Sequence, residues 1–226
     1  MYEAYRRLCR QSLSDTVVVS PEDSGLHCFT DPRNFAKVEL LNFQPVVALF
    51  HDILSPKERN DLMSAAIQSD LQVPKTVSAR SGQIKSDVQK RTGKMAFITD
   101  DNDDNHILAR VKAKTSHLSG LEVAEEDATE PLQVVNYGIG GHYEPHVDFF
   151  VGHNTTELLQ GDRVATMLFY LGGDQVVGGA TVFPYLNLAV RPQAGTALFW
   201  YNTHRGRAEG GGGDAATLHA GCPGTY

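Results

Sequence analysis

The chain has 226 residues, of which 41% are hydrophobic and 21% charged, and its formal net charge is −7. A negative balance argues against a nucleic-acid partner bound through the phosphate backbone, because proteins that bind in this way are normally basic. No run of about 18 apolar residues is present, so we also expect no membrane span and no membrane partner. The length is sufficient for one sizeable hydrophobic core.

The first part of the chain predicts a short helix and two strands. Residues 1–34 are expected to form a helix over residues 2–13 followed by an irregular connection, and residues 35–226 to form the main domain. Strands are predicted at Lys37–Leu41 and Val46–Phe50, where apolar residues gather.

Two helices are predicted next. Ser55–Glu58 reads Ser-Pro-Lys-Glu, which combines an N-cap serine, a first-turn proline and the glutamate of a capping box. A second helix is predicted from about Asn105 to Leu118, and Gly120 is its expected end. The buried stripe of the first of these helices is expected to consist of Leu62, Met63, Ala66 and Ile67.

An acidic run, Asp-Asp-Asn-Asp-Asp at residues 100–104, lies between the two helices. It lacks the loop glycine and the closing glutamate of an EF-hand calcium site. We therefore interpret it as a solvated turn before the second helix.

From Leu132 onward the sequence changes to short apolar runs separated by glycine and proline. The runs are LQVVNY, RVATMLFYL, ATVF, NLAV and GTALFWY. Several short strands punctuated in this way predict a sandwich, a barrel or a jelly roll. Gly210–Gly213 are expected to form a flexible loop within this half.

Side chains that could bind a metal gather in NYGIGGHYEPHVDFF, residues 136–150. A zinc-binding helix is excluded there, because Glu144 is misplaced and Pro145 would break the helix. On a strand, His146 and Asp148 would instead project to the same side. His219 could supply a third ligand, and two histidines with one carboxylate suit non-haem Fe(II). A hydrogen-bonded surface pair is the alternative for His146 and Asp148.

Several longer motifs follow one another in an order that resembles a known family. YEPHVDF, GDRVATMLFYL, GGATVFP, GTALFWYN and LHAGCP resemble the catalytic domain of the prolyl 4-hydroxylase α-subunit family, the procollagen-proline 4-dioxygenases. The resemblance implies an α+β fold with a double-stranded β-helix (jelly roll) core and N-terminal supporting helices. It also implies 4-hydroxylation of peptidyl proline in collagen-like or proline-rich chains, with Fe(II), 2-oxoglutarate, O₂ and L-ascorbate.

The same resemblance implies roles for individual residues. His146, Asp148 and His219 correspond to the iron ligands. Tyr137 corresponds to a tyrosine that contacts the 2-oxoglutarate carboxylate. Tyr170 would line the co-substrate pocket, and a buried strand tyrosine is the alternative interpretation.

On the peptide-substrate side, the resemblance points to Tyr143 and Arg163. Arg163 could equally be a structural ion-pair former. His142 matches no ligand and is expected at the rim of the site.

The cysteines and one sequon bear on the cellular compartment. A disulfide between Cys9 and Cys28 would close a short loop, and Asn154-Thr155-Thr156 is an N-glycosylation sequon. No signal peptide is recognisable after Met1. The resemblance nevertheless implies the endoplasmic reticulum lumen, and a protein disulfide isomerase-type β subunit as a partner.

The resemblance further implies features beyond Tyr226. Family members carry a lysine past the distal histidine, which pairs with the far carboxylate of 2-oxoglutarate, and a downstream partner for Cys222. We therefore expect a C-terminally incomplete domain without its final strand. Without the lysine, 2-oxoglutarate binding should be weak unless Arg205 or Arg207 replaces it. The alternative function is then a catalytically impaired family member that acts as a binding or partner subunit.

Overall fold

The computed structural model of the chain describes residues 1–13, 27–73, 75–77, 84–86, 91–99, 103, 106–123, 128–151, 161–173, 175–204 and 212–225. The sequence predictions for Asn154, Arg205 and Arg207 lie outside these ranges. Among the described residues, no helix is both long and apolar enough to cross a membrane.

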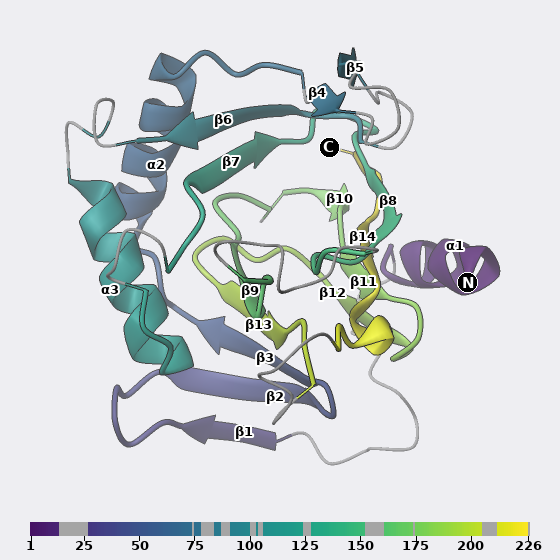
Figure 1. Ribbon diagram of the computed structural model, residues 1–226, viewed down its shortest axis with the longest axis horizontal. Coiled ribbons are helices and arrows are strands. Elements are labelled where there is room, and N and C mark those ends of the chain that lie inside the picture. Colours follow the sequence, from purple (N-terminus) through teal and green to yellow (C-terminus); the bar gives the residue numbers. More distant parts are fainter. Residues whose placement is uncertain are drawn as a thin grey trace.

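Helices and strands occupy the described residues as follows (Figure 1). The helices are α1 (Tyr2–Gln11), α2 (Pro56–Gln68), α3 (Ile107–Ser119) and the 3-10 helix η3 (Ala215–Thr217). The strands of the first half are β1 (His27–Thr30), β2 (Lys37–Phe43), β3 (Val46–His51), β4 (Lys75–Val77), β5 (Ile84–Ser86) and β6 (Lys94–Ile98). Those of the second half are β7 (Leu132–Asn136), β8 (Tyr143–His146), β9 (Ala165–Phe169), β10 (Val177–Gly178), β11 (Thr181–Phe183), β12 (Leu188–Val190), β13 (Ala197–Tyr201), β14 (His219–Gly221) and β15 (Gly224–Thr225).

Two antiparallel sheets form the centre of the fold. The first sheet has the strand order β1-β2-β3-β13-β9, and the second has the order β12-β11-β14-β8. Side chains of both sheets meet in one apolar cluster, to which the first sheet contributes Val47 and Trp200 and the second contributes Phe183 and Val190. Two sheets that share a core, with helices outside them, confirm the predicted α+β jelly-roll class.

β13 lies inside the first sheet, between β3 and β9, and is covered on both faces. Leu198 and Trp200 face the core between the sheets, whereas Ala197 and Phe199 belong to a second cluster that includes Leu118 of α3. Successive residues of a strand point to opposite faces, so a strand covered on both sides needs apolar side chains throughout. This position explains the uninterrupted apolar run ALFWY.

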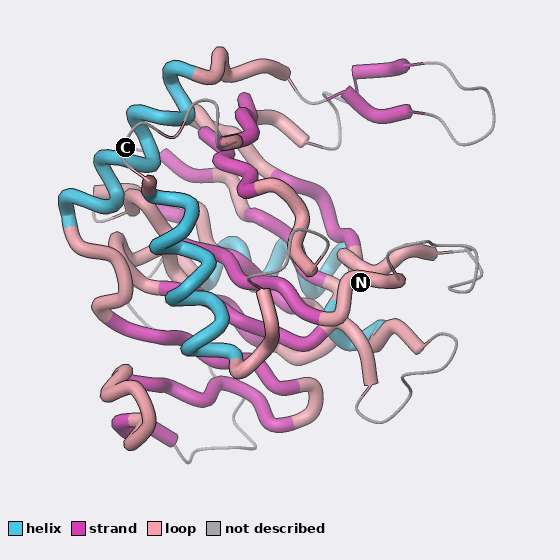
Figure 2. Tube along the Cα trace, turned by 60° about the vertical axis from the view of Figure 1, so that its left-hand side comes forward, coloured by secondary structure: helices cyan, strands magenta, loops and turns pink. Residues whose placement is uncertain are grey.

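The helices cover opposite sides of the strands. α2 and α3 lie together along one side, and α1 lies on the other side next to β11 and β12 (Figures 1 and 2). The predicted capping box begins α2, since the Ser55 hydroxyl bonds the backbone N–H of Glu58 and the Glu58 carboxylate bonds the backbone N–H of Ser55. These two reciprocal bonds satisfy backbone groups that the first turn of a helix leaves without partners.

The predicted buried stripe of α2 is correct at two positions and wrong at two. Leu62 and Ala66 are buried, whereas Met63 is on the surface and Ile67 is 69% exposed. Ala65 is the further buried residue of this helix. Positions 62, 65 and 66 follow the i, i+3, i+4 spacing of one helical face, so Met63 and Ile67 fall outside the contact with β6.

Asp103 precedes α3 and caps its first turn through its side chain, so the prediction of a solvated turn is wrong for this residue. Its carboxylate is buried and accepts hydrogen bonds from the backbone N–H groups of Ile107 (2.7 Å) and Leu108 (2.8 Å). A carboxylate in this place satisfies two N-terminal helix donors. At the other end, Gly120 terminates α3 in the left-handed conformation, as predicted.

The disulfide bond joins Cys9 to Cys222, so the predicted pairing of Cys9 with Cys28 is wrong, as is the expected downstream partner for Cys222. Cys9 is on α1, which packs near the end of β14, and the two Cα atoms are 5.5 Å apart, a normal spacing for a disulfide. Cys28 is an exposed free thiol on β1, the edge strand of the other sheet. Closeness in sequence favoured Cys28, but the packing of α1 against the second sheet decides the pairing.

Candidate metal centre and substrate site

The three residues predicted as iron ligands converge where β8 meets β14. β8 ends at His146, Asp148 follows two residues later, and β14 begins at His219. His146 and His219 are direct partners in the antiparallel pairing of these strands. One ligand-type atom from each of the three residues lies within 4.8 Å of the other two. Strand pairing therefore brings together side chains from distant parts of the sequence.

Hydrogen bonds determine which ring nitrogen of each histidine carries the proton. His146 Nδ1 lies 2.7 Å from the Glu144 carbonyl oxygen, and His219 Nδ1 lies 3.0 Å from the Thr217 carbonyl oxygen. A carbonyl oxygen can only accept, so each proton resides on Nδ1 and each Nε2 keeps its lone pair. Both Nε2 atoms face Asp148, each 3.7 Å from a carboxylate oxygen.

Burial keeps both imidazoles neutral. It lowers the pKa of His146 to about 4, with the neighbouring His219 acting in the same direction. Burial also lowers the pKa of His219. At neutral pH, two imidazole lone pairs and one carboxylate therefore face the same small volume with no proton between them. A divalent cation stabilises such a set of acceptors, so these residues fit a two-histidine, one-carboxylate metal centre.

Aromatic rings line the histidines. Trp200 lies edge-on to His219, with ring centroids 4.7 Å apart, and the Phe183 ring is 5.7 Å from the same imidazole. Tyr143 stacks on His146 at 3.6 Å. Because Trp200 and Phe183 are buried, this side of the centre excludes water, and electrostatic interactions there are stronger than in solvent.

Tyr137 lies near the centre, after β7. Its phenol is within hydrogen-bonding reach of Arg91 and within electrostatic range of Asp148. Tyr137 is 38% exposed as a whole, and desolvation of its phenol raises the pKa above the ordinary value. A tyrosine of ordinary pKa is already protonated at neutral pH, so the hydroxyl can donate a hydrogen bond. Its predicted contact with the co-substrate stays a prediction.

Tyr170 lies deeper, in the core between the two sheets. Its hydroxyl donates to Thr181 Oγ1 over 2.8 Å, and burial raises the pKa of the phenol. This placement agrees with the alternative interpretation, a buried tyrosine, and its role toward the co-substrate stays a prediction.

Arg163 forms the structural ion pair that the sequence left open as an alternative, and its role toward the peptide substrate stays a prediction. It forms an ion pair with Glu130 and also donates to the Asp148 carbonyl oxygen over 3.1 Å. Its guanidinium lies 4.8 Å from the centroid of the Phe150 ring. Arg163 is thus a structural ion-pair former placed directly beside a ligand-type residue.

The sequence reasoning missed two charged residues of this region, Arg91 and Glu130. Arg91 lies over the Tyr143 ring, 4.7 Å from its centroid, and donates to Gln133 Oε1 over 2.9 Å. Both stand outside the quoted motifs. The contacts that place Arg91, among them an isolated β-bridge to Tyr143 and the hydrogen bond to Gln133, have no signature in the sequence.

His142 does not join the metal-ligand cluster. Its Nδ1 lies 3.4 Å from the Gly140 carbonyl oxygen. The cluster of ligand-type residues consists of His146, Asp148 and His219 and does not include His142. The pairing of His142 with His146 that a zinc helix would need is therefore not formed.

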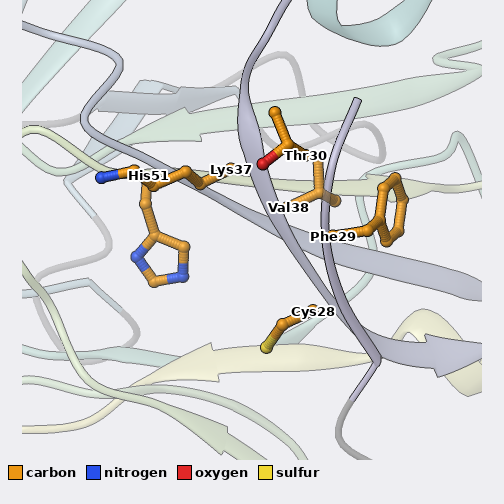
Figure 3. Close-up of a pocket in the computed structure, with 6 residues that line it drawn as sticks. All are labelled: Cys28, Phe29, Thr30, Lys37, Val38 and His51. Carbon is orange, nitrogen blue, oxygen red and sulfur yellow. The ribbon is translucent and has the colours of Figure 1, made fainter. Parts of the chain in front are cut away.

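A surface hollow of about 510 Å³ lies away from these residues, on β1–β3 of the first sheet (Figure 3). Cys28 and Phe29 come from the edge strand and His51 from β3. The hollow shares no residue with the metal-ligand cluster, so it is not the place where the ligand-type side chains gather.

Comparison with known proteins agrees with this geometry. Residues 132–225, which contain all three ligand-type residues, match the family model of the 2OG-Fe(II) oxygenase superfamily. This part of the chain is therefore a 2OG-Fe(II) oxygenase domain.

The chain is 40% identical over 187 residues to prolyl 4-hydroxylase subunit alpha-3 of Homo sapiens, and 39% identical over 187 residues to subunit alpha-1 of Homo sapiens. The chain thus carries a 2OG-Fe(II) oxygenase domain and is similar in sequence to prolyl 4-hydroxylase α-subunits, the resemblance that its motifs predicted. These alignments cover 82% and 80% of this chain but 32% of each relative. The chain therefore spans about a third of the length of the curated relatives it matches.

Among solved structures, the fold is similar to a viral collagen prolyl hydroxylase from Paramecium bursaria Chlorella virus-1 in complex with 2OG. The TM-score is 0.58 at 22% identity, and the match covers 80% of this chain and 89% of that chain. A truncated form of the viral protein gives a TM-score of 0.54, with 79% and 82% covered. These likenesses show a shared fold.

Proposed function

We propose that this chain is the catalytic part of a prolyl 4-hydroxylase that acts on proline in collagen-like or proline-rich chains. The observation that carries the proposal is the convergence of two histidine Nε2 lone pairs and one carboxylate at His146, Asp148 and His219. Fe(II) held there, with 2-oxoglutarate and O₂ as co-substrates and L-ascorbate as reductant, would supply the oxidising chemistry.

The chain's own residues bind, orient and shield. In the proposal, Tyr137 donates a hydrogen bond to the 2-oxoglutarate carboxylate, since its phenol is protonated at neutral pH. Tyr170 forms an inner wall of the co-substrate pocket, next to Thr181. The Trp200 ring packs against His219 and excludes water from that side of the centre.

Tyr143 and Arg163 form the peptide-binding side in this proposal. An extended polyproline II segment loses little conformational entropy on binding, and an aromatic ring offers a flat apolar surface to a proline ring. Arg163 is already held by Glu130, so donating to a peptide carbonyl costs little further ordering.

The cellular setting is part of the same proposal and rests on the resemblance to the family and, for Asn154, on its sequon. It comprises the endoplasmic reticulum lumen, a protein disulfide isomerase-type β subunit as partner, and N-glycosylation at Asn154. The division of the chain at residues 34 and 35 into an N-terminal segment and a catalytic domain also belongs here.

Metal binding is tested first, without turnover. Trp200 is the single tryptophan of the chain and lies 4.7 Å from His219, so its fluorescence should report a metal at the centre. We expect Co(II), an air-stable substitute for Fe(II), to quench this emission saturably. His146→Ala and Asp148→Ala should lose the response, and the control His142→Ala should keep it. The same saturable quenching in Asp148→Ala as in the unmodified chain would contradict the assignment.

Activity is tested next, with Fe(II), 2-oxoglutarate, ascorbate and a Pro-Pro-Gly repeat peptide. We expect succinate release together with a gain of one oxygen per hydroxylated proline in the mass of the peptide. Tyr143→Ala should raise the KM for the peptide. Metal and peptide binding without succinate release would overturn the catalytic role and favour the second candidate, a catalytically impaired binding or partner subunit.

A further inference from the structure

Two residues outside the predicted site connect Asp148 to the first sheet. The Thr166 hydroxyl on β9 donates to Asp148 Oδ2 over 2.7 Å, and Asn202 Nδ2 lies 2.9 Å from Thr166 Oγ1. Asn202 follows β13 directly and is fully buried, with 0% of its surface exposed. Asp148, a candidate metal ligand that follows β8 of the second sheet, is therefore hydrogen-bonded to side chains on and next to strands of the first sheet.

The chemistry of the three groups determines the direction of this hydrogen-bonded chain. The Asp148 carboxylate can only accept, so the single hydroxyl hydrogen of Thr166 points toward it. The Thr166 oxygen is then left as an acceptor, and only the NH₂ group of Asn202 can donate to it. With the amide reversed, two acceptor oxygens would face each other at hydrogen-bonding distance, so the Asn202 amide holds the hydroxyl in one orientation.

The main chain of Asn202 leads to the other half of the centre. Its carbonyl oxygen accepts from the backbone N–H of Asp214 over 2.7 Å, and the Asp214 carbonyl oxygen accepts from the Thr217 backbone (3.0 Å) and hydroxyl (2.7 Å). The Thr217 carbonyl oxygen is the partner of His219 Nδ1. Asn202 is thus linked to Asp148 through its side chain and to His219 through its main chain.

We propose that Asn202 is a positioning residue of the metal centre, which acts through Thr166 to hold the Asp148 carboxylate toward the two histidine Nε2 atoms. The proposal rests on the proposed function, because it concerns the same centre. The terminal torsion of a carboxylate is broad, so without Thr166 the group is free to turn. Hydrogen-bond partners of metal ligands typically change metal affinity by about 10- to 100-fold when removed.

The test is the Co(II) affinity of matched variants. Two readouts measure it: the quenching of Trp200 fluorescence, and the visible absorption of the bound Co(II), which reports its coordination. Thr166→Val removes the hydroxyl at constant shape, and Asn202→Leu removes the amide at similar shape. Each should weaken Co(II) binding by about 10- to 100-fold. Thr166→Ser keeps the hydroxyl and should retain affinity. Thr196→Val is the matched control, because the Thr196 hydroxyl donates to the Gln193 carbonyl oxygen over 2.8 Å, and Gln193 does not belong to the metal-ligand cluster.

The double variant Thr166→Val/Asn202→Leu separates a relay from two independent effects. If Asn202 acts through Thr166, the double variant should bind Co(II) as Thr166→Val does, because the amide has no hydroxyl left to orient. Losses that add up in the double variant would overturn the relay. So would equal affinity in all variants, which would leave the proposed function intact.

Two further outcomes are decisive. Absence of saturable quenching in the unmodified chain would overturn the proposed metal centre, and the relay with it. If circular dichroism shows that Asn202→Leu does not fold, the comparison of Thr166→Val with Thr166→Ser decides. A tenfold or larger difference in affinity between them supports the relay, and equal affinities overturn it.

Discussion

The carbonyl oxygens of Glu144 and Thr217 each bond the Nδ1–H of a histidine two residues later. Every residue type supplies a backbone carbonyl, so these two positions orient the imidazoles without needing a particular side chain. The consequence is that the tautomers of His146 and His219 depend on the path of the backbone rather than on a sequence motif.

At the residue scale, Gly213 differs from its prediction. The sequence predicted a flexible loop for Gly210–Gly213, but Gly213 is packed against its neighbours. It forms an isolated bridge with Thr203 and lies against the Phe149 ring. A Cβ atom on Gly213 would come within 2.1 Å of that ring. The side chain next to Asp148 therefore occupies the space that the glycine leaves.

We expect Gly213→Ala to displace the Phe149 ring and to lower the free energy of unfolding by about 1–3 kcal/mol, the usual cost of overpacking. Urea denaturation measures this, and a Co(II) titration shows whether Asp148 moves with its neighbour. Gly172→Ala is the control, because nothing lies within 4 Å of a Cβ atom there. Equal stability of the two variants would contradict the assigned contact.

At the scale of elements, α3 depends on Asp103 for its first turn. We expect Asp103→Ala to lower the free energy of unfolding by about 1–2 kcal/mol, because two backbone N–H groups lose their buried acceptor. Thermal and urea denaturation check this. Asp103→Asn keeps one carbonyl oxygen and should lose less, so an equal loss in both variants would argue against the capping role.

Local sequence signals predicted the helices and strands well, because all the residues of each signal lie within a few positions of one another in the chain. Ser55 and Glu58 form the capping box within one helical turn, and Gly120 ends α3 by its own conformation. The ligand-type residues His146 and Asp148 were also found because they lie in one short motif. Their convergence with His219, however, needed the family resemblance, since it depends on which strands pair.

What the sequence did not reveal involves contacts between elements far apart in the chain. Thr166 and Asn202 look like ordinary residues of apolar strand runs, and only the meeting of the two sheets joins them to Asp148. The exposure of Met63 and Ile67 likewise follows from which face of α2 meets β6. No local pattern encodes the angle of a helix on a sheet.

At the scale of the whole molecule, the disulfide fastens α1 to the second sheet just beyond His219. We expect non-reducing peptide mapping to find Cys9 joined to Cys222, with Cys28 open to alkylation. The double variant Cys9→Ser/Cys222→Ser should lower the free energy of unfolding by about 2–5 kcal/mol. Cys28→Ser is the matched control and should unfold like the unmodified chain. Recovery of a Cys9–Cys28 peptide would refute the pairing.

β14 lies between β11 and β8, both of which precede it in the chain. During translation the N-terminal parts of a protein emerge first, so β8 and β11 each have an open edge before β14 is made. Open strand edges are templates for pairing with other molecules. The insertion of β14 covers the facing edges of β11 and β8, and the same step delivers His219 to its two partners.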